Sequence, residues 1–114
     1  DPAADSLRAV TVPANNPFKM WRIVDDVLVP LVDSGIPEQY NQPRQALPAA
    51  YWQTGTLDVM RAATVLALGS MTGRRILPLV IDPDLAVDID DPLSLALAED
   101  RCRRYGLVAD LRTD

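Results

Sequence analysis

The hydrophobic positions of this chain fall into short runs that prolines, glycines and pairs of acidic residues interrupt. Runs of this length, rich in β-branched residues, indicate strands more than long helices. We predict strands at residues 7–12, 18–24, 27–32, 51–59, 76–81 and 87–89. The run at 76–81 is apolar throughout, which is typical of a strand buried on both faces of a sheet. Asp25 and Asp26 separate two of these strands and predict a hairpin turn.

The clearest helix covers residues 92–105. Asp91 stands at its N-cap, Pro92 at its first position and Gly106 just after its end, which are the favoured residues at these places. Spacings of three and four residues form an apolar stripe of Leu95, Ala98, Cys102 and Tyr105. We expect Cys102 on this stripe to be buried as a small hydrophobic residue.

A shorter helix is expected at residues 60–68, with Gly69 as its C-cap. Residues 33–43 form a polar loop that contains glycine and proline. The order of strands and helices is an α/β alternation, which the hairpin and this loop interrupt as an insertion. Trp21, Tyr51 and Trp52 lie in or near this insertion. They form either an exposed surface that needs a partner or a local core, and both interpretations stay open.

Composition narrows the range of functions. The chain is 48% hydrophobic and 24% charged, as in a folded globular protein. Its net charge is −5 and it has no run rich in Lys or Arg, which argues against nucleic-acid binding. It has no histidine, so this chain itself supplies neither a histidine for catalysis nor a histidine ligand for zinc. The one cysteine fits a reducing, cytoplasmic setting, and no apolar run is long enough for a membrane helix.

Two acidic residues near the last helix are candidates for metal binding. In a strand, Asp88 and Asp90 share one face, because side chains alternate along an extended chain. Carboxylates this close repel each other unless a cation lies between them, and Mg²⁺ prefers oxygen ligands of this kind. Asp91 is then left to cap the helix. The alternative is an acidic loop that only contacts solvent, since Asp-x-Asp is common by chance.

Basic residues occur in two short segments that are candidates for anion binding. Residues 43–48 read Pro-Arg-Gln-Ala-Leu-Pro, and the two prolines predict an extended segment that presents Arg44 and Gln45. The arginine fork suits a carboxylate or a phosphate. Lys19 lies between apolar neighbours and either attracts such an anion or only extends to solvent from a strand. For Arg44, too, plain exposure in a loop is the alternative.

Taken in order, these segments resemble the acylneuraminate cytidylyltransferase family over about residues 7–99. Asn-Pro-Phe-Lys at 16–19 is similar to the family's Pro-x-Lys segment. Residues 42–48 are similar to its Pro-Arg-Gln-x-Leu-Pro segment, and residues 87–92 to its Asp-x-Asp ending. No one of these segments is specific, and the resemblance lies in the ordered set.

The resemblance implies a fold and a division of the chain. It implies that residues 1–114 form the C-terminal half of a Rossmann-like nucleotidyltransferase domain with an inserted dimerisation hairpin and loop. Residues 18–73 would be the dimerisation and sugar-binding insertion of a homodimer, and residues 76–114 the C-terminal strand and helix with Asp-x-Asp. The family's Gly-rich nucleotide loop would lie upstream of Asp1. We therefore expect no turnover from the isolated chain.

The resemblance also implies a reaction, the transfer of CMP from CTP to a sialic-acid-like sugar acid with release of pyrophosphate. Asp88 and Asp90 would hold Mg²⁺ and act as catalytic residues. The implied substrate-binding residues are Lys19, Arg44 and Gln45. Thr54 and Asp58 replace an asparagine and a tyrosine of the family, so Asp58 is expected to line the sugar pocket in place of an aromatic ring.

Two alternatives remain. One is a non-catalytic dimerisation or regulatory module that keeps the fold without nucleotide chemistry. The other is a nucleotidyltransferase that acts on a different acidic sugar, which the change at Asp58 favours.

Overall fold

The computed structural model describes residues 1–107 and contains two compact units. The first consists of Asp1–Thr11 with the described residues from Gln53 onward, and the second is Val12–Trp52. Within the described residues the regular elements are a three-stranded sheet, a two-stranded hairpin, two α-helices and four short 3₁₀ helices. The α/β class is therefore confirmed at this level. The expected C-terminal portion, residues 76–114, can be compared only as far as residue 107.

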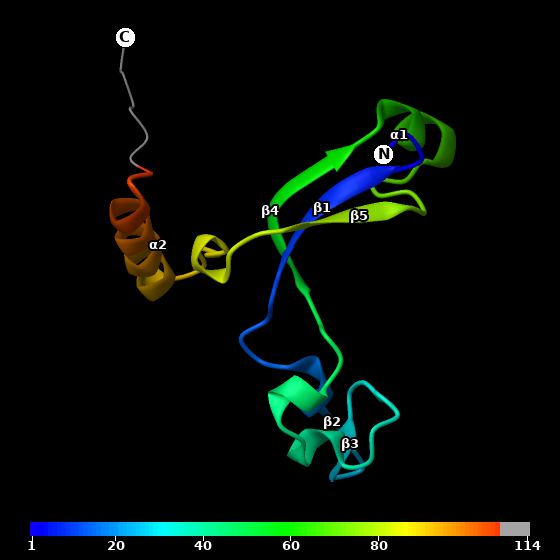
Figure 1. Cartoon of the computed structure of the whole chain (residues 1–114), viewed down its shortest axis with the longest axis vertical. Helices are drawn as coiled ribbons and strands as arrows, with labels where there is room; N and C mark the ends of the chain where they lie inside the picture. The colour runs from blue at the N-terminus through cyan, green and yellow to red at the C-terminus, as the bar shows by residue number, and fades with distance from the viewer. Residues whose placement is uncertain (108–114) are drawn as a thin grey trace. The chain divides into compact units, whose positions relative to one another are not determined.

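The sheet of the first unit has β1 (Ser6–Thr11) between β4 (Trp52–Met60) and β5 (Ile76–Val80). β1 and β5 are parallel, with Ser6 opposite Ile76. β4 runs in the opposite direction on the other side of β1 (Figure 1). The three strands predicted for these regions are confirmed, with ends that differ by one residue.

The burial expected for residues 76–81 is wrong. Four of the five residues of β5 are exposed, and Val80 keeps 55% of its surface accessible. The N–H of Ile81 donates to the C=O of Val10 at 2.9 Å, so the odd-numbered residues bond to β1. Pro78 then faces the open side, where its missing N–H costs no ladder hydrogen bond. β5 is an edge strand, and Pro78 was the sequence signal for it.

The second unit contains a hairpin of β2 (Trp21–Val24) and β3 (Val27–Pro30). Asp25 and Asp26 have φ angles of 49° and 62°, the left-handed pair that a type I′ turn requires. The predicted hairpin is thus confirmed. β2 starts later than predicted, because Pro17–Lys19 forms a short 3₁₀ helix, η1, in place of extended chain.

The shorter of the two predicted helices is α1 (Ala62–Leu68). The helix is confirmed, and Gly69 ends it with a φ angle of 58°. This is the left-handed C-cap that glycine adopts without steric cost.

Within residues 1–107, no helix combines the length and the apolar character needed to cross a membrane.

The helix α2 (Pro92–Tyr105) has the predicted bounds. Asp91 Oδ1 accepts a hydrogen bond from the N–H of Ser94 at 2.7 Å, and Gly106 follows with a φ angle of 64°. Both caps are therefore confirmed. The predicted burial of Cys102 is wrong, since its side chain is exposed. The stripe is apolar, but burial also needs a neighbouring element that covers it, which a sequence pattern does not report.

Buried polar side chains hold the strands together. Among the described residues the buried apolar side chains are Ala9 and Leu47. The buried polar residues are Ser6, Thr11, Gln39, Thr54 and Thr64. The hydroxyl of Thr11, for example, donates to the C=O of Ile81 at 2.8 Å, just beyond the end of β5. These side chains have hydrogen-bond partners, as buried polar groups require.

The carboxylate of Asp5 joins the start of β1 to the segment before β5. Its Oδ2 accepts from the N–H groups of Arg74 and Arg75, both at 2.8 Å, and its Oδ1 accepts from Thr64 Oγ1 at 3.4 Å. The hydrogen bond from Arg75 is the main cause that lowers the pKa of Asp5 below its ordinary value of 3.8. The charged form is therefore favoured by folding.

We expect Asp5→Asn to lower the free energy of unfolding at pH 7, and the loss to shrink in acid. A carboxyl group whose pKa falls on folding stabilises the folded state at pH values above its unfolded pKa of about 3.9. This contribution disappears as the pH falls through the folded pKa. Urea denaturation of both proteins from pH 7 to pH 2 measures the difference. A difference that stays constant over this range would contradict the role of the charge.

Candidate functional site

The first wall of the candidate site is the turn that contains η1. The side chain of Asn16 caps it, because Asn16 Oδ1 accepts from the N–H of Phe18 at 2.9 Å. The N–H of Lys19 donates to the C=O of Asn16 at 3.0 Å, and the N–H of Met20 to that of Pro17 at 3.1 Å. An Asn-Pro pair favours this turn, since it supplies both a cap and a first helical residue. Lys19 therefore leaves a tight turn with an exposed side chain.

The second wall is a 3₁₀ helix, η3 (Arg44–Ala46), and the extended conformation predicted for residues 43–48 is wrong at this point. The N–H of Leu47 donates to the C=O of Arg44 at 3.2 Å and closes the turn. Leu47 is buried, with 8% of its surface accessible, and anchors the segment. The guanidinium of Arg44 donates to the C=O of Pro13, which fixes one end of the fork.

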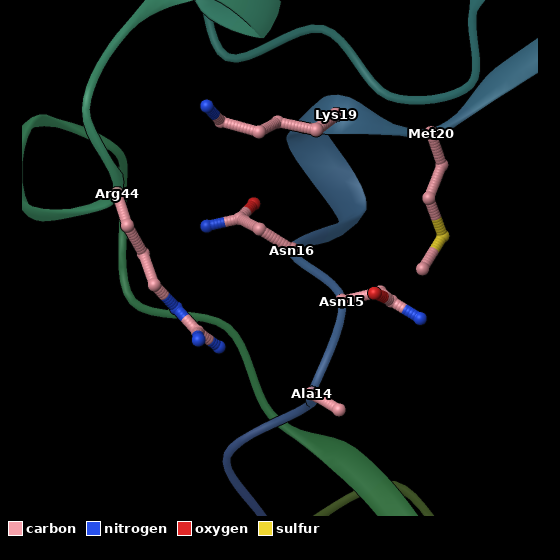
Figure 2. Close-up of a pocket in the computed structure, with 6 residues that line it drawn as sticks. All are labelled: Ala14, Asn15, Asn16, Lys19, Met20 and Arg44. Carbon is pink, nitrogen blue, oxygen red and sulfur yellow. The ribbon is translucent and has the colours of Figure 1, made fainter.

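These two walls border an open cavity of about 450 Å³. It is lined by Ala14, Asn15, Asn16, Lys19, Met20 and Arg44. The side chains of Lys19, Asn16 and Arg44 project into the same space, and the Asn16 amide lies between the two cationic groups in this view (Figure 2). No carboxylate lines the cavity, and neither Lys19 nor Arg44 has an acidic partner within residues 1–107. The cavity thus presents donors and positive charge.

A second, smaller hollow of about 110 Å³ adjoins the first, and Asn16 and Arg44 line both. Its other lining residues are Val12, Pro13, Leu47, Pro48, Ala49, Ala50 and Tyr51. Most of these side chains are apolar. Together the two spaces suit a ligand that has an anionic group beside a less polar body.

Gln39 supports this site through hydrogen bonds to the surrounding backbone, although no sequence pattern indicated this role. Its side chain is buried, with 3% of its surface accessible. Its Oε1 accepts from the N–H of Ser34 at 2.7 Å, and its Nε2 donates to the C=O groups of Phe18 at 3.1 Å and of Val32. These bonds hold the η1 turn against the following loop. A glutamine in a polar loop gives no periodic signal, so only the folded chain reveals this role.

Two other predicted substrate residues lie elsewhere. Gln45 follows Arg44 in η3, but it is exposed and does not line the cavity. Asp58 lies on β4 in the first unit, where it accepts from Arg8 Nε at 2.8 Å and from Arg8 Nη2 at 2.9 Å. This carboxylate raises the pKa of Arg8. Asp58 therefore has a bidentate partner within the protein, and its contact with a sugar stays a prediction.

The strand predicted at residues 87–89 is wrong, because the structure has irregular chain there. The argument that Asp88 and Asp90 share one strand face therefore fails. Both residues are exposed, and within residues 1–107 no three His, Cys, Asp or Glu side chains gather where a metal ion could bind. Asp91 is used as the predicted cap, and the N–H of Ser94 lowers its pKa. A Mg²⁺ site of these two carboxylates, completed by substrate phosphates, therefore stays a prediction.

Comparison with protein-family models and with curated proteins finds no match to this chain. A proposal for the function of this chain therefore depends on the site itself and on the ordered sequence motifs. The cavity contains a guanidinium, an ammonium and an amide, all of which can donate hydrogen bonds, and its lining has no nucleophile paired with a base. This set of groups can bind and orient an anion, but it does not perform bond-making chemistry by itself.

Proposed function

We propose that this chain binds the carboxylate of a sugar acid and belongs to a cytidylyltransferase of the acylneuraminate type. One observation carries the proposal: Lys19 and Arg44, which lie in two separate motifs, line one cavity without any carboxylate. The lysine supplies a point charge and the arginine a planar fork, and both favour a carboxylate. The larger cavity offers room for the sugar, and the adjoining hollow for one of its smaller substituents.

In this proposal the three-stranded sheet is part of a Rossmann-like nucleotidyltransferase domain that works in the cytoplasm. The anomeric hydroxyl oxygen of the sugar acid attacks the α-phosphorus of CTP. The bond from that phosphorus to the bridging oxygen breaks, and pyrophosphate leaves with the electron pair. The products are the CMP-sugar and pyrophosphate. The carboxylate contacts of Lys19 and Arg44 orient the sugar for this attack.

Asp88 and Asp90 are the proposed acidic residues of this reaction. Both carboxylates are exposed, and no hydrogen bond within residues 1–107 occupies their side chains. They would hold Mg²⁺, which supplies charge neutralisation for the phosphates of CTP. One of the two carboxylates would also accept the proton of the attacking hydroxyl.

The test is binding of N-acetylneuraminic acid and of its methyl ester, which differ only at the carboxylate. We expect the acid to bind at least about tenfold more tightly, because a charge-assisted hydrogen bond contributes about 1.5–3 kcal/mol. Chemical-shift titration of the ¹⁵N-labelled chain measures both dissociation constants. Equal affinities, or binding of neither compound, would refute the proposed anion site.

We also propose that two copies of the chain associate through the hairpin. The resemblance implies a homodimer, and the hairpin carries large apolar side chains that are more than a third exposed. These residues are Trp21, Ile23, Val24, Val27 and Leu28. Trp21, Ile23 and Leu28 lie on one face of the hairpin, and Val24 and Val27 lie on the other. Two strands alone are marginally stable in water, so a second hairpin that covers the face of Ile23 would stabilise both copies.

Ile23→Asp is expected to shift the chain to the monomer. Ile23 is 75% exposed and lies opposite Leu28, so the new carboxylate would enter the middle of an apolar contact. Sedimentation velocity of the variant and the unchanged chain measures the two masses. Leu66→Asp on α1, at a side chain 86% exposed, is the matched control and should remain dimeric. A monomeric wild-type chain would overturn the dimer proposal.

A further inference from the structure

The amide of Asn16 is held in one orientation by the backbone. The N–H of Phe18 donates to Asn16 Oδ1 at 2.9 Å. In an amide side chain only the oxygen can accept such a bond, so the oxygen must face Phe18 and the NH₂ group must face the other way. Figure 2 shows this NH₂ group directed into the cavity between Lys19 and Arg44.

The NH₂ group of Asn16 has no acceptor within residues 1–107. The cap bond fixes its direction before any ligand arrives, which reduces the entropy lost on binding. Asn16 also lines both the larger and the smaller hollow, at the place where they meet. An anion held by Arg44 therefore lies beside a fixed, uncharged donor.

We infer that Asn16 is the third contact of the bound anion and determines the preference for a free carboxylate. This inference rests on the proposed function, because it concerns the same cavity. A carboxylate has two oxygens and about four acceptor positions, more than one guanidinium fork uses. Arg44 and Lys19 supply the positive charge. Asn16 contacts a carboxylate oxygen that the fork leaves open, and esterification removes charge and acceptor strength at that oxygen.

The chemistry of the cap provides a sharp test of this contact. Asp has the same shape as Asn and also accepts a hydrogen bond as an N-cap, so Asn16→Asp keeps the bond from Phe18. It replaces the donor in the cavity with a negative oxygen, which repels the ligand's carboxylate. Asn16→Ser keeps an accepting cap oxygen as well, but it removes the NH₂ group without adding a charge.

The experiment titrates N-acetylneuraminic acid and its methyl ester into each variant of the full chain and follows ¹⁵N chemical shifts. We expect Asn16→Asp to weaken binding of the acid about 30-fold or more, and Asn16→Ser about five- to tenfold. Affinity for the ester should change less than about threefold in both. Asn41→Asp makes the same exchange at an exposed residue of the same unit outside the cavity, and should change neither affinity by more than about twofold.

The outcomes separate this inference from the proposed function. If the unchanged chain does not prefer the acid over the ester, the proposed function fails and this inference fails with it. If the chain prefers the acid and Asn16→Asp retains that preference, only the role of Asn16 is refuted. A loss of preference in Asn16→Asp and a smaller loss in Asn16→Ser, with far-ultraviolet circular dichroism unchanged, supports the inference.

Discussion

Arg44→Ala is expected to weaken binding of N-acetylneuraminic acid about 100-fold and to leave the methyl ester much less affected. The guanidinium lines the cavity that also contains Lys19, and it has no acidic partner within residues 1–107. Two charge-assisted hydrogen bonds to one carboxylate contribute about 3 kcal/mol or more together, and 1.4 kcal/mol corresponds to tenfold in affinity. The same chemical-shift titration measures this loss.

Arg44→Lys distinguishes the planar fork from the charge alone. We expect an intermediate loss of about tenfold, because lysine keeps the charge but not the bidentate geometry. Arg22→Ala is the matched control, since Arg22 is an exposed arginine of β2 in the same unit and does not line the cavity. If Arg22→Ala weakens the acid as much as Arg44→Ala does, the effect comes from net charge and the assignment of Arg44 is wrong.

Gly73→Ala is expected to destabilise the first unit by about 2–4 kcal/mol. Gly73 has a φ angle of 72°, which a side chain disfavours, and a Cβ added there would lie 2.4 Å from Asp5 Cβ. Such a contact cannot be relieved by rotating a flexible side-chain end, because Asp5 Cβ is bonded to the backbone of the chain just before β1. The displaced carboxylate would also lose its bonds from Arg74 and Arg75.

Gly69→Ala isolates the cost of the backbone conformation. Gly69 has a φ angle of 58° in the same unit, but nothing lies within 4 Å of an added Cβ. We expect a loss of about 1 kcal/mol there. Urea denaturation of both variants measures the two losses. Equal losses would show that Gly73 is needed only for its conformation and not for the close approach of Asp5.

Local signals predicted the elements that short stretches of chain specify. The bounds of α2 follow from Asp91 at the N-cap and Gly106 after the last turn, and both caps occur as expected. The hairpin turn at Asp25 and Asp26 was also predicted, since the acidic pair tolerates the left-handed conformation. In each case a residue's own preference and its nearest neighbours decide the structure.

Predictions of which side chains are buried, and of which side chains share a strand face, failed where they depended on residues far away in the sequence. The apolar run at 76–81 predicted a buried strand, but β5 pairs on one side only and remains exposed. Cys102 lies on an apolar stripe and is exposed as well. Asp88 and Asp90 were placed on one strand face, and no strand forms there. An apolar pattern indicates which side chains of a segment could be buried, whereas their burial requires another element that packs against them.

The sequence by itself determined which residue types were available for binding: no histidine, two basic motifs and an acidic pair before a capped helix. Only the tertiary structure decided that Lys19 and Arg44 line one cavity, that Asn16 aims an amide between them and that Asp58 pairs with Arg8. The physical reason is the separation in sequence between the residues that interact. Caps and turns depend on contacts within a few residues, while a cavity depends on long-range hydrogen bonds such as that from Gln39 to Phe18.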